Sequence, residues 1–263
     1  MNTNQPRRRL AAAVLVTAIT GGSLAGALSA VALTTAFPAA TPSTQASAGA
    51  ATVSYSTTDL EKAITNVAAS ASGSVVQVLA QVNLGGPFGG NGESSGSGFA
   101  VSADGLIVTS LHVVDGATAI QVLLPDTSRA DASVVATDAT NDLAVLRVDA
   151  GGLTPLSIAP GSVEIGQTVI AIGTPLGEFS NSVTTGIVSG LDRTVDVGSG
   201  RGSEHLEGVI QTDAALSSGM SGGPILNVAG QVVGVTTAVA QSAQGVGFAE
   251  PAATVASLLA TIG

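Results

Sequence analysis

The chain has 263 residues, of which 45% are hydrophobic, 10% are charged and 2% are aromatic. That length is enough for one larger domain or two small ones with a buried core. The absence of cysteine excludes disulfide scaffolds, thiolate zinc sites, iron–sulfur clusters and cysteine nucleophiles. Because His112 and His205 are the only histidines, a three-histidine metal site is excluded as well, and we expect no metal and no cofactor.

Charge is distributed unevenly along the chain. Arg7, Arg8 and Arg9 are the only charged residues among the first fifty, which therefore carry +3. Five basic and eighteen acidic side chains follow, so residues 51–263 carry −13 and the whole chain carries −10. A body this acidic repels phosphate backbones, and we expect no nucleic-acid partner.

Residues 1–37 combine the three arginines with an uncharged stretch of 28 residues, Leu10–Phe37. About 20 apolar residues span a bilayer as a helix, and arginines on one side only place the N-terminus in the cytoplasm. We therefore expect a single-pass anchor that holds the acidic body outside the cytoplasm, at the cell membrane. The alternatives are a cleaved signal, which would leave the protein secreted, and a buried soluble helix. Residues 38–57, rich in Ala, Ser, Thr and Pro, are predicted to be a linker.

The body opens on one helix and continues as short strands. Thr58–Glu61 forms a capping-box pattern, and Leu60, Ile64 and Val67 recur at helical spacing. Asp104-Gly105 has the composition of a hairpin turn, and Pro251 begins a C-terminal helix. Between the two helices, β-branched runs predict strands at Ser74–Val82, Gly98–Val101, Leu106–Ser110, Ala119–Leu124, Ser133–Ala136, Leu143–Val148, Thr168–Ile172, Val183–Ser189, Gly208–Thr212, Gln231–Ala238 and Gly245–Phe248.

This order of elements predicts an all-β fold. No helices alternate with the strands, so a parallel α/β sheet is disfavoured. The strands fall into two sets on either side of the Pro/Gly-rich join at Gly151–Gly161, which suggests two small barrels. We expect one domain over residues 58–263, with a first barrel at about 72–155, a second at about 162–250, and a helix at 251–262.

Three short segments carry residues suited to catalysis. His112 follows a predicted strand, Asp142 follows Asn141 in a turn, and Ser221 lies in a bend rich in Gly and Ser, 217–224. Each segment alone is more often structural: a packed histidine, a turn, or a bend. Together they match the requirement of a serine nucleophile for an imidazole base and a carboxylate that orients it. The order histidine, aspartate, serine is that of the chymotrypsin class.

Residues 58–262 resemble the HtrA/Deg branch of the trypsin-like serine peptidases. The motifs that carry the resemblance are the strand into His112, Gly96-Ser97-Gly98-Phe99, Asn141-Asp142-Leu143-Ala144-Val145-Leu146, Thr184-Thr185-Gly186-Ile187-Val188-Ser189, Gln211-Thr212-Asp213-Ala214-Ala215, Gly219-Met220-Ser221-Gly222-Gly223-Pro224 and Gly245-Val246-Gly247-Phe248-Ala249. The resemblance implies two packed antiparallel six-stranded β-barrels. It also implies that His112 is the general base, Asp142 orients it, Ser221 is the nucleophile, and the backbone N–H groups of Gly219 and Ser221 form the oxyanion hole.

The chain departs from the family pattern at several positions. Leu111 precedes the histidine, Met220 precedes the serine, and Glu250 stands at a position that is normally apolar. The sequence ends at Gly263, so we expect no PDZ domain. His205 lies in a polar stretch, 198–207, that we expect to be a surface loop. The resemblance makes this stretch a regulatory loop, and the alternative is a metal site of His205 with Glu204 and Glu207.

We expect a serine endopeptidase that cleaves unfolded or misfolded extracytoplasmic polypeptides. The alternatives are a catalytically silent polypeptide-binding chaperone or envelope module, and an esterase with the same triad. The resemblance makes a homotrimer the candidate assembly, with Tyr55 and Phe88 as aromatic contacts. It also places the floor of the specificity pocket at Ala215 and its wall at Val235, Thr236 and Thr237. Cleavage is therefore expected after small aliphatic residues.

Overall fold

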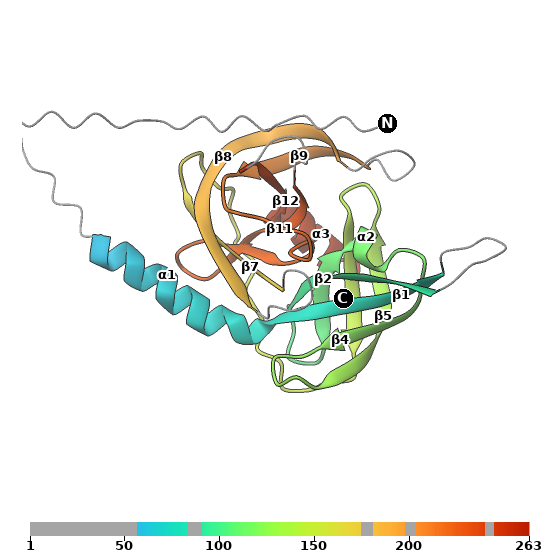
Figure 1. The fold of residues 1–263 in the computed structure, drawn as a ribbon. Helices are drawn as coiled ribbons and strands as arrows, with labels where there is room; N and C mark the ends of the chain where they lie inside the picture. The colour runs from blue at the N-terminus through green and yellow to red at the C-terminus, as the bar shows by residue number, and fades with distance from the viewer. Residues whose placement is uncertain (1–56, 84–90, 175–180, 198–203, 240–244, 263) are drawn as a thin grey trace, which may run out of the picture. The chain divides into compact units, whose positions relative to one another are not determined.

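The computed structural model describes residues 57–83, 91–174, 181–197, 204–239 and 245–262 (Figure 1). These residues form two closed antiparallel β-barrels of six strands each. The prediction of an all-β fold with two six-stranded barrels is confirmed. The expected anchor at residues 1–37 lies outside the described residues, as do Tyr55 and Phe88. Among the helices that the structure describes, none is both long and apolar enough to cross a membrane.

The first barrel is formed by strands that pair in the order β1-β2-β3-β6-β5-β4. A one-turn helix, α2 (Leu111–Val114), follows β3. The predicted turn at Asp104-Gly105 lies between β2 and β3; Gly105 has φ +105°, and a Cβ there would lie 2.2 Å from the carbonyl oxygen of Val148. The strands are β1 (Val75–Asn83), β2 (Asn91–Ala100), β3 (Leu106–Ser110), β4 (Ala117–Leu123), β5 (Arg129–Asp138) and β6 (Leu143–Val148).

The second barrel pairs its strands in the order β10-β11-β12-β9-β8-β7. The second barrel differs from the sequence-based expectation at several strands: β10 was not predicted, β8 extends to Val197 rather than ending at Ser189, and β9 begins at Glu204 rather than Gly208. His205 therefore lies in a strand, opposite Asp196 of β8, and not in a loop. The strands are β7 (Thr168–Gly173), β8 (Ser182–Val197), β9 (Glu204–Thr212), β10 (Pro224–Leu226), β11 (Val232–Val239) and β12 (Gly247–Pro251).

Two helices flank the barrels, as predicted. Helix α1 (Thr57–Ala71) leads through a short 3-10 turn, η1 (Ser72–Ser74), into β1, and α3 (Ala252–Leu259) follows β12 (Figure 1). The face of α1 that carries Val67 and Ala71 is buried, and α3 buries Val255 and Leu258. Both helices thereby contribute to the core that the barrels share.

That shared core, the inter-barrel cluster, is what makes the two barrels one packed unit. It is built from buried side chains of both barrels and both helices: Val67, Ala71, Val75, Phe99, Val108, Leu143, Val145, Ile170, Ile172, Leu226, Val232, Val235, Val255 and Leu258. Burial of this much apolar surface is the main favourable contribution to packing one barrel on the other. Residues at the ends of β3, β6 and β11 are held in place by it.

Phe99 is a direct test of the inter-barrel cluster, because its side chain is fully buried there. Replacing Phe99 with Ala should lower the free energy of unfolding by about 3–5 kcal/mol, since the ring is lost and a cavity remains. Val134, which is 42% exposed on β5, provides the control: Val134→Ala should cost less than about 0.5 kcal/mol. Urea denaturation of the full-length chain measures both values, and equal losses would contradict a shared core.

Candidate active site

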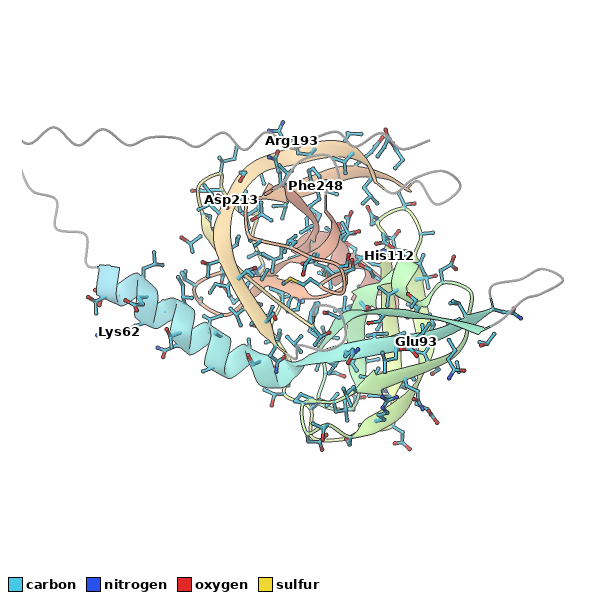
Figure 2. The ribbon with its side chains drawn as sticks, in the orientation of Figure 1. Lys62, Glu93, His112, Arg193, Asp213 and Phe248 are labelled. Atoms are coloured by element: carbon cyan, nitrogen blue, oxygen red, sulfur yellow. The ribbon has the colours of Figure 1, made fainter. Side chains whose placement is uncertain are left out.

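His112 is presented by α2, immediately after β3 (Figure 2). Its ring Nδ1 lies 2.6 Å from Oδ2 of Asp142, and its backbone N–H donates to Oδ1 of the same carboxylate at 2.8 Å. A carboxylate at Nδ1 favours the tautomer that carries the proton there, so Nε2 keeps its lone pair. The two contacts fix both the orientation of the ring and its tautomer.

Asp142 adopts a left-handed backbone conformation, with φ +48°, and is 3% exposed. Asp and Asn tolerate this conformation better than most residues. The preceding turn is closed by Asp138, which accepts hydrogen bonds from the backbone and side chain of Asn141. The Asp142 carbonyl accepts the N–H of Leu111. The first barrel alone therefore assembles the His112–Asp142 pair.

Thr237 connects this pair to the second barrel. Its hydroxyl donates to Asp142 Oδ2 at 2.7 Å, and its carbonyl accepts the Ser221 hydroxyl at 3.3 Å. This role of Thr237 was missed in the sequence, where Thr236 and Thr237 are adjacent and chemically identical. Only the strand register, with its irregularity between Thr236 and Ala238, decides which hydroxyl faces Asp142. The residue type, a small hydroxyl near the end of the strand, was the only available signal.

Ser221 lies in the nucleophile loop, residues 217–223, which contacts both barrels. Ser97 of β2 donates its N–H to the Ser221 carbonyl at 2.8 Å and its hydroxyl to the Gly219 carbonyl at 2.6 Å. On the other side, the N–H of Gly222 donates to the Thr236 carbonyl at 2.7 Å. Ser97 has 0% exposure, and its motif was noticed in the sequence but given no role. It holds the loop from the first barrel.

Two glycines make this close packing feasible. Gly222 has φ +83°, and a Cβ there would lie 2.2 Å from the Ser97 carbonyl oxygen. Gly219 has φ +90°. Among the described residues, the backbone N–H groups of Gly219 and Ser221 donate to no recorded partner. The resemblance implies that these two N–H groups form the oxyanion hole, and this role stays a prediction.

The four predicted substrate-binding residues occupy different environments. Ala215 is exposed. Val235 points into the inter-barrel cluster and is fully buried. Thr236 uses its N–H and carbonyl within the site, and both Thr236 and Thr237 are buried. The side chains of these three strand residues are therefore covered by the protein rather than exposed to a substrate.

The departures from the family pattern are also accommodated. Met220 is buried in the core of the second barrel, and Leu111 packs against the core of the first. Neither removes a polar group from the site. Glu250 is 1% exposed on β12.

His205 lies close to His112, which the sequence did not indicate. A cavity of about 420 Å³ is lined by Leu111, His112, Asp115, Ala139, Asp142, His205 and Leu206. His205 Nδ1 lies 2.7 Å from Asp196, and Nε2 lies 3.3 Å from Glu207. Hydrogen bonds to these two carboxylates raise the pKa of His205. Since the group is exposed, this shift has little bearing on stability.

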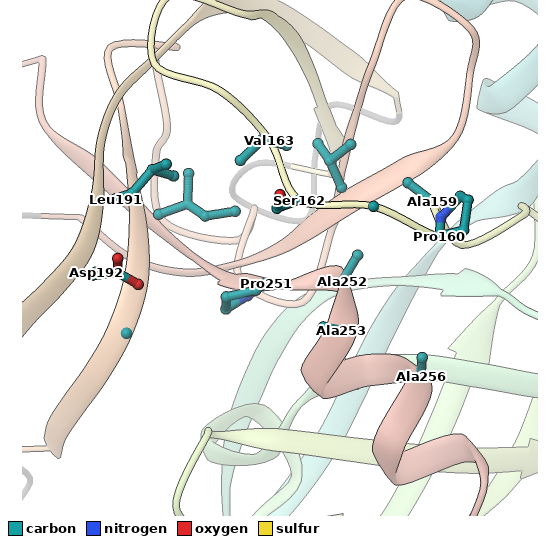
Figure 3. A pocket seen from close by; sticks show the side chains of 14 residues that line it. Ala159, Pro160, Ser162, Val163, Leu191, Asp192, Pro251, Ala252, Ala253 and Ala256 are labelled. Carbon is teal, nitrogen blue, oxygen red and sulfur yellow. The ribbon is translucent and has the colours of Figure 1, made fainter.

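A larger pocket, of about 600 Å³, lies away from these residues (Figure 3). Leu191 and Asp192 line one side of it, and Ala252 and Ala256 of α3 line the other. Its described lining residues include Ser162 and Asp192 but no histidine. None of the predicted site residues borders it.

Known proteins with similar sequences and folds are peptidases. The family described as the trypsin-like peptidase domain matches residues 96–235. The putative serine protease HhoB of Synechocystis is 44% identical over 161 residues, covering 60% of this chain and 38% of that protein. A probable periplasmic serine endoprotease, DegP-like, of Pseudomonas savastanoi is 41% identical over 148 residues, covering 56% of this chain and 29% of that protein.

A solved structure, the HtrA-type protease AlgW with a tripeptide, superposes with a TM-score of 0.64 and is 32% identical. The superposition covers 76% of this chain and 63% of that one. This chain thus spans less than two fifths of the two curated relatives it matches.

Thr237 provides a test of the site that depends only on the reactivity of Ser221. Replacing Thr237 with Val removes one donor to Asp142 while keeping the shape of the side chain. A hydrogen bond to a charged group contributes about 1.5–3 kcal/mol, so the rate of Ser221 labelling by a fluorophosphonate should fall about 10- to 100-fold. Thr237→Ser keeps the hydroxyl and should react at close to the wild-type rate. Labelling of the Val variant at the wild-type rate would exclude an orienting role for the hydroxyl.

Proposed function

The chain belongs to the family of trypsin-like peptidase domains, in its HtrA/Deg-like branch, and we propose that it is a serine endopeptidase. The observation that carries the proposal is the Asp142 carboxylate, which accepts hydrogen bonds from His112 and from Thr237. Thr237 in turn accepts the Ser221 hydroxyl. Ser221 is thus connected to Asp142 through Thr237, and Asp142 in turn contacts His112. Such an arrangement suits acyl transfer.

The reaction proceeds in two halves. His112 Nε2 takes the hydroxyl proton of Ser221 as Oγ attacks the scissile carbonyl carbon. The resulting oxyanion accepts hydrogen bonds from the N–H groups of Gly219 and Ser221. His112 then gives the proton to the departing amine, which leaves Ser221 acylated. A water, deprotonated by His112, attacks the carbonyl carbon of the ester. His112 then gives that proton to Ser221 Oγ as the carboxylic acid product leaves.

Asp142 and Thr237 act on the charge that forms during this reaction. When His112 takes the proton it becomes an imidazolium, and the adjacent Asp142 carboxylate stabilises that cation. The Thr237 hydroxyl keeps the carboxylate oriented toward Nδ1. Ser97 holds the Gly219 and Ser221 carbonyls, which directs the neighbouring N–H groups toward the oxyanion.

The substrate class is extended polypeptide outside the cytoplasm. Support comes from the relative named as a periplasmic endoprotease and from the structure of AlgW with a tripeptide. The arginines and the uncharged stretch Leu10–Phe37 are consistent with a membrane anchor. In that setting the enzyme would remove unfolded or misfolded proteins, which expose the extended segments that a strand edge can bind.

Two substitutions test the catalytic assignment. Ser221→Ala should abolish hydrolysis of an unfolded protein without preventing folding, because only the nucleophile is lost. Asp142→Asn should lower turnover by about four orders of magnitude, since the amide favours the wrong tautomer of His112. Casein digestion measures both. Near-wild-type digestion by either variant would show that the triad is assigned wrongly. If a fluorophosphonate did not label the wild-type chain, that result would instead support the catalytically silent binding module.

The primary specificity is for small or medium aliphatic residues. Ala215, six residues before Ser221, is the proposed pocket floor; it is exposed and offers neither charge nor bulk. A buried Lys or Arg side chain would have no carboxylate to offset its desolvation there. Discrimination among aliphatic residues should be modest, because one methylene is worth about 1–3 kcal/mol.

Cleavage sites in a reduced, unfolded protein test this pocket. Mass spectrometry should find most cuts after Val, Ala, Leu or Ile, and few after Lys or Arg. Ala215→Asp should shift cleavage toward basic residues, because it adds the missing carboxylate. A majority of cuts after Lys or Arg in the wild type would rule out the pocket assignment even with Ser221 as nucleophile.

A further inference from the structure

Glu250 is a carboxyl group placed where the two barrels meet. It lies on β12, directly opposite Val235 of β11 in the antiparallel register. Residues paired in this way point to the same face of a sheet, and Val235 points into the inter-barrel cluster. The Glu250 side chain therefore faces the same apolar region, and the residue is 1% exposed.

The described part of the chain offers this carboxyl no hydrogen-bond partner. Among the described residues, neither Oε1 nor Oε2 of Glu250 makes a hydrogen bond. Strand β11 and helix α3 contain no charged residue. Strand β9, which also pairs with β12, carries Glu204, His205 and Glu207 before its paired stretch, Ile210–Thr212. The charged groups that act on it are Asp142 and Asp138, both carboxylates of the first barrel.

An ionised carboxylate in this position would be strongly destabilising. A buried charge without a counter-ion or hydrogen bonds loses its hydration, and no protein interaction replaces it. Two nearby negative charges add repulsion. Burial, followed by the charges of Asp142 and Asp138, raises the pKa of Glu250 to about 8. At neutral pH the group is therefore a neutral acid, which an apolar core can accommodate.

The same region connects the two halves of the candidate site, which are His112 and Asp142 in the first barrel and Ser221 in the second. Strand β11 carries Val235, opposite Glu250, and two residues later Thr237, which contacts both Asp142 and Ser221. A charge that forces β12 and β11 away from the first barrel would withdraw the Thr237 hydroxyl from Asp142. It would also shift the Thr236 carbonyl, which anchors Gly222 of the nucleophile loop.

We propose that Glu250 is a positioning residue of the catalytic site, whose bound proton keeps the second barrel seated against Asp142 and His112. Loss of the proton places a second negative charge beside Asp142 and separates the two halves of the site. The inference rests on the proposed function, because the group that it positions is the proposed triad. Glu250 itself touches no reacting atom.

The linkage to pH has a definite sign. The folded chain retains a proton that the unfolded chain releases above the ordinary value of 4.5. The unfolded state then binds fewer protons than the folded state, so the free energy of unfolding falls as pH rises from 4.5 to about 8. Above about pH 8 the contribution of Glu250 to the free energy of unfolding no longer changes with pH. Glu250→Gln keeps the shape without a titrating proton and removes this dependence.

The test compares wild type, Glu250→Gln and a control, Glu93→Gln, as full-length chains. Glu93 is an exposed carboxyl on β2, labelled in Figure 2. Cleavage of an internally quenched peptide is followed from pH 6 to 9.5, with kcat and KM determined separately. Urea unfolding is measured on the same chains at pH 6 and pH 9.

We expect wild type and Glu93→Gln to lose kcat reversibly as pH rises through the Glu250 transition, about tenfold for one pH unit beyond it, with KM little changed. Glu250→Gln should keep its kcat at pH 9 and should unfold with a smaller difference between the two pH values. Superimposable alkaline kcat profiles for wild type and Glu250→Gln would overturn the positioning role, even if their stabilities differed.

The unfolding measurement separates this inference from the proposed function. If no variant hydrolysed peptide at any pH, the proposed enzyme and the positioning role would both fail, while the altered pH dependence of unfolding would still reveal the buried proton. If wild type were active but its unfolding showed the same pH dependence as Glu250→Gln, the proposed function would stand and the role of Glu250 would be overturned.

Discussion

The Asp142 carboxylate is the interaction on which the candidate site depends. Its two oxygens accept from the backbone N–H and the ring of His112 and from the hydroxyl of Thr237. Two of these donors belong to the first barrel and one to the second. Since the group is almost fully buried, each unmet hydrogen bond would be costly. The packing of one barrel on the other is thereby linked to the orientation of the imidazole.

The nucleophile loop also depends on both barrels. It belongs to the second barrel, but the N–H and hydroxyl of Ser97, in the first barrel, hold its carbonyls. Gly222 permits the approach, because any Cβ there would meet the Ser97 backbone. Each barrel therefore holds part of the other's catalytic apparatus, and neither would provide an organised site alone.

The electrostatics of the site follow from a shortage of positive charge. Residues 51–263 contain five basic and eighteen acidic side chains. Among the residues that the structure describes, no cation lies beside Glu250. Around His205, the carboxylates of Asp196 and Glu207 are solvated and share a histidine. Glu250, in the core, has no such neighbour and keeps its proton instead. The two buried acids differ in their hydrogen-bond donors: Asp142 accepts from His112 and Thr237, whereas Glu250 accepts from none of the described residues.

Local patterns in the chain predicted the class of fold and the order of the chemical groups. Alternating β-branched runs between Gly, Asp and Pro specify strands through local geometry, so the barrels and both flanking helices could be predicted. Histidine, aspartate and serine could be paired as a hypothesis because each needs the others chemically. Tertiary structure alone decided that Thr237 and not Thr236 reaches Asp142, that His205 lies in a strand beside the His112 cavity, and that Glu250 faces the inter-barrel cluster. These outcomes depend on register, on one strand irregularity and on contacts between residues far apart in the chain, because a shift of one residue turns a side chain to the opposite face of a sheet.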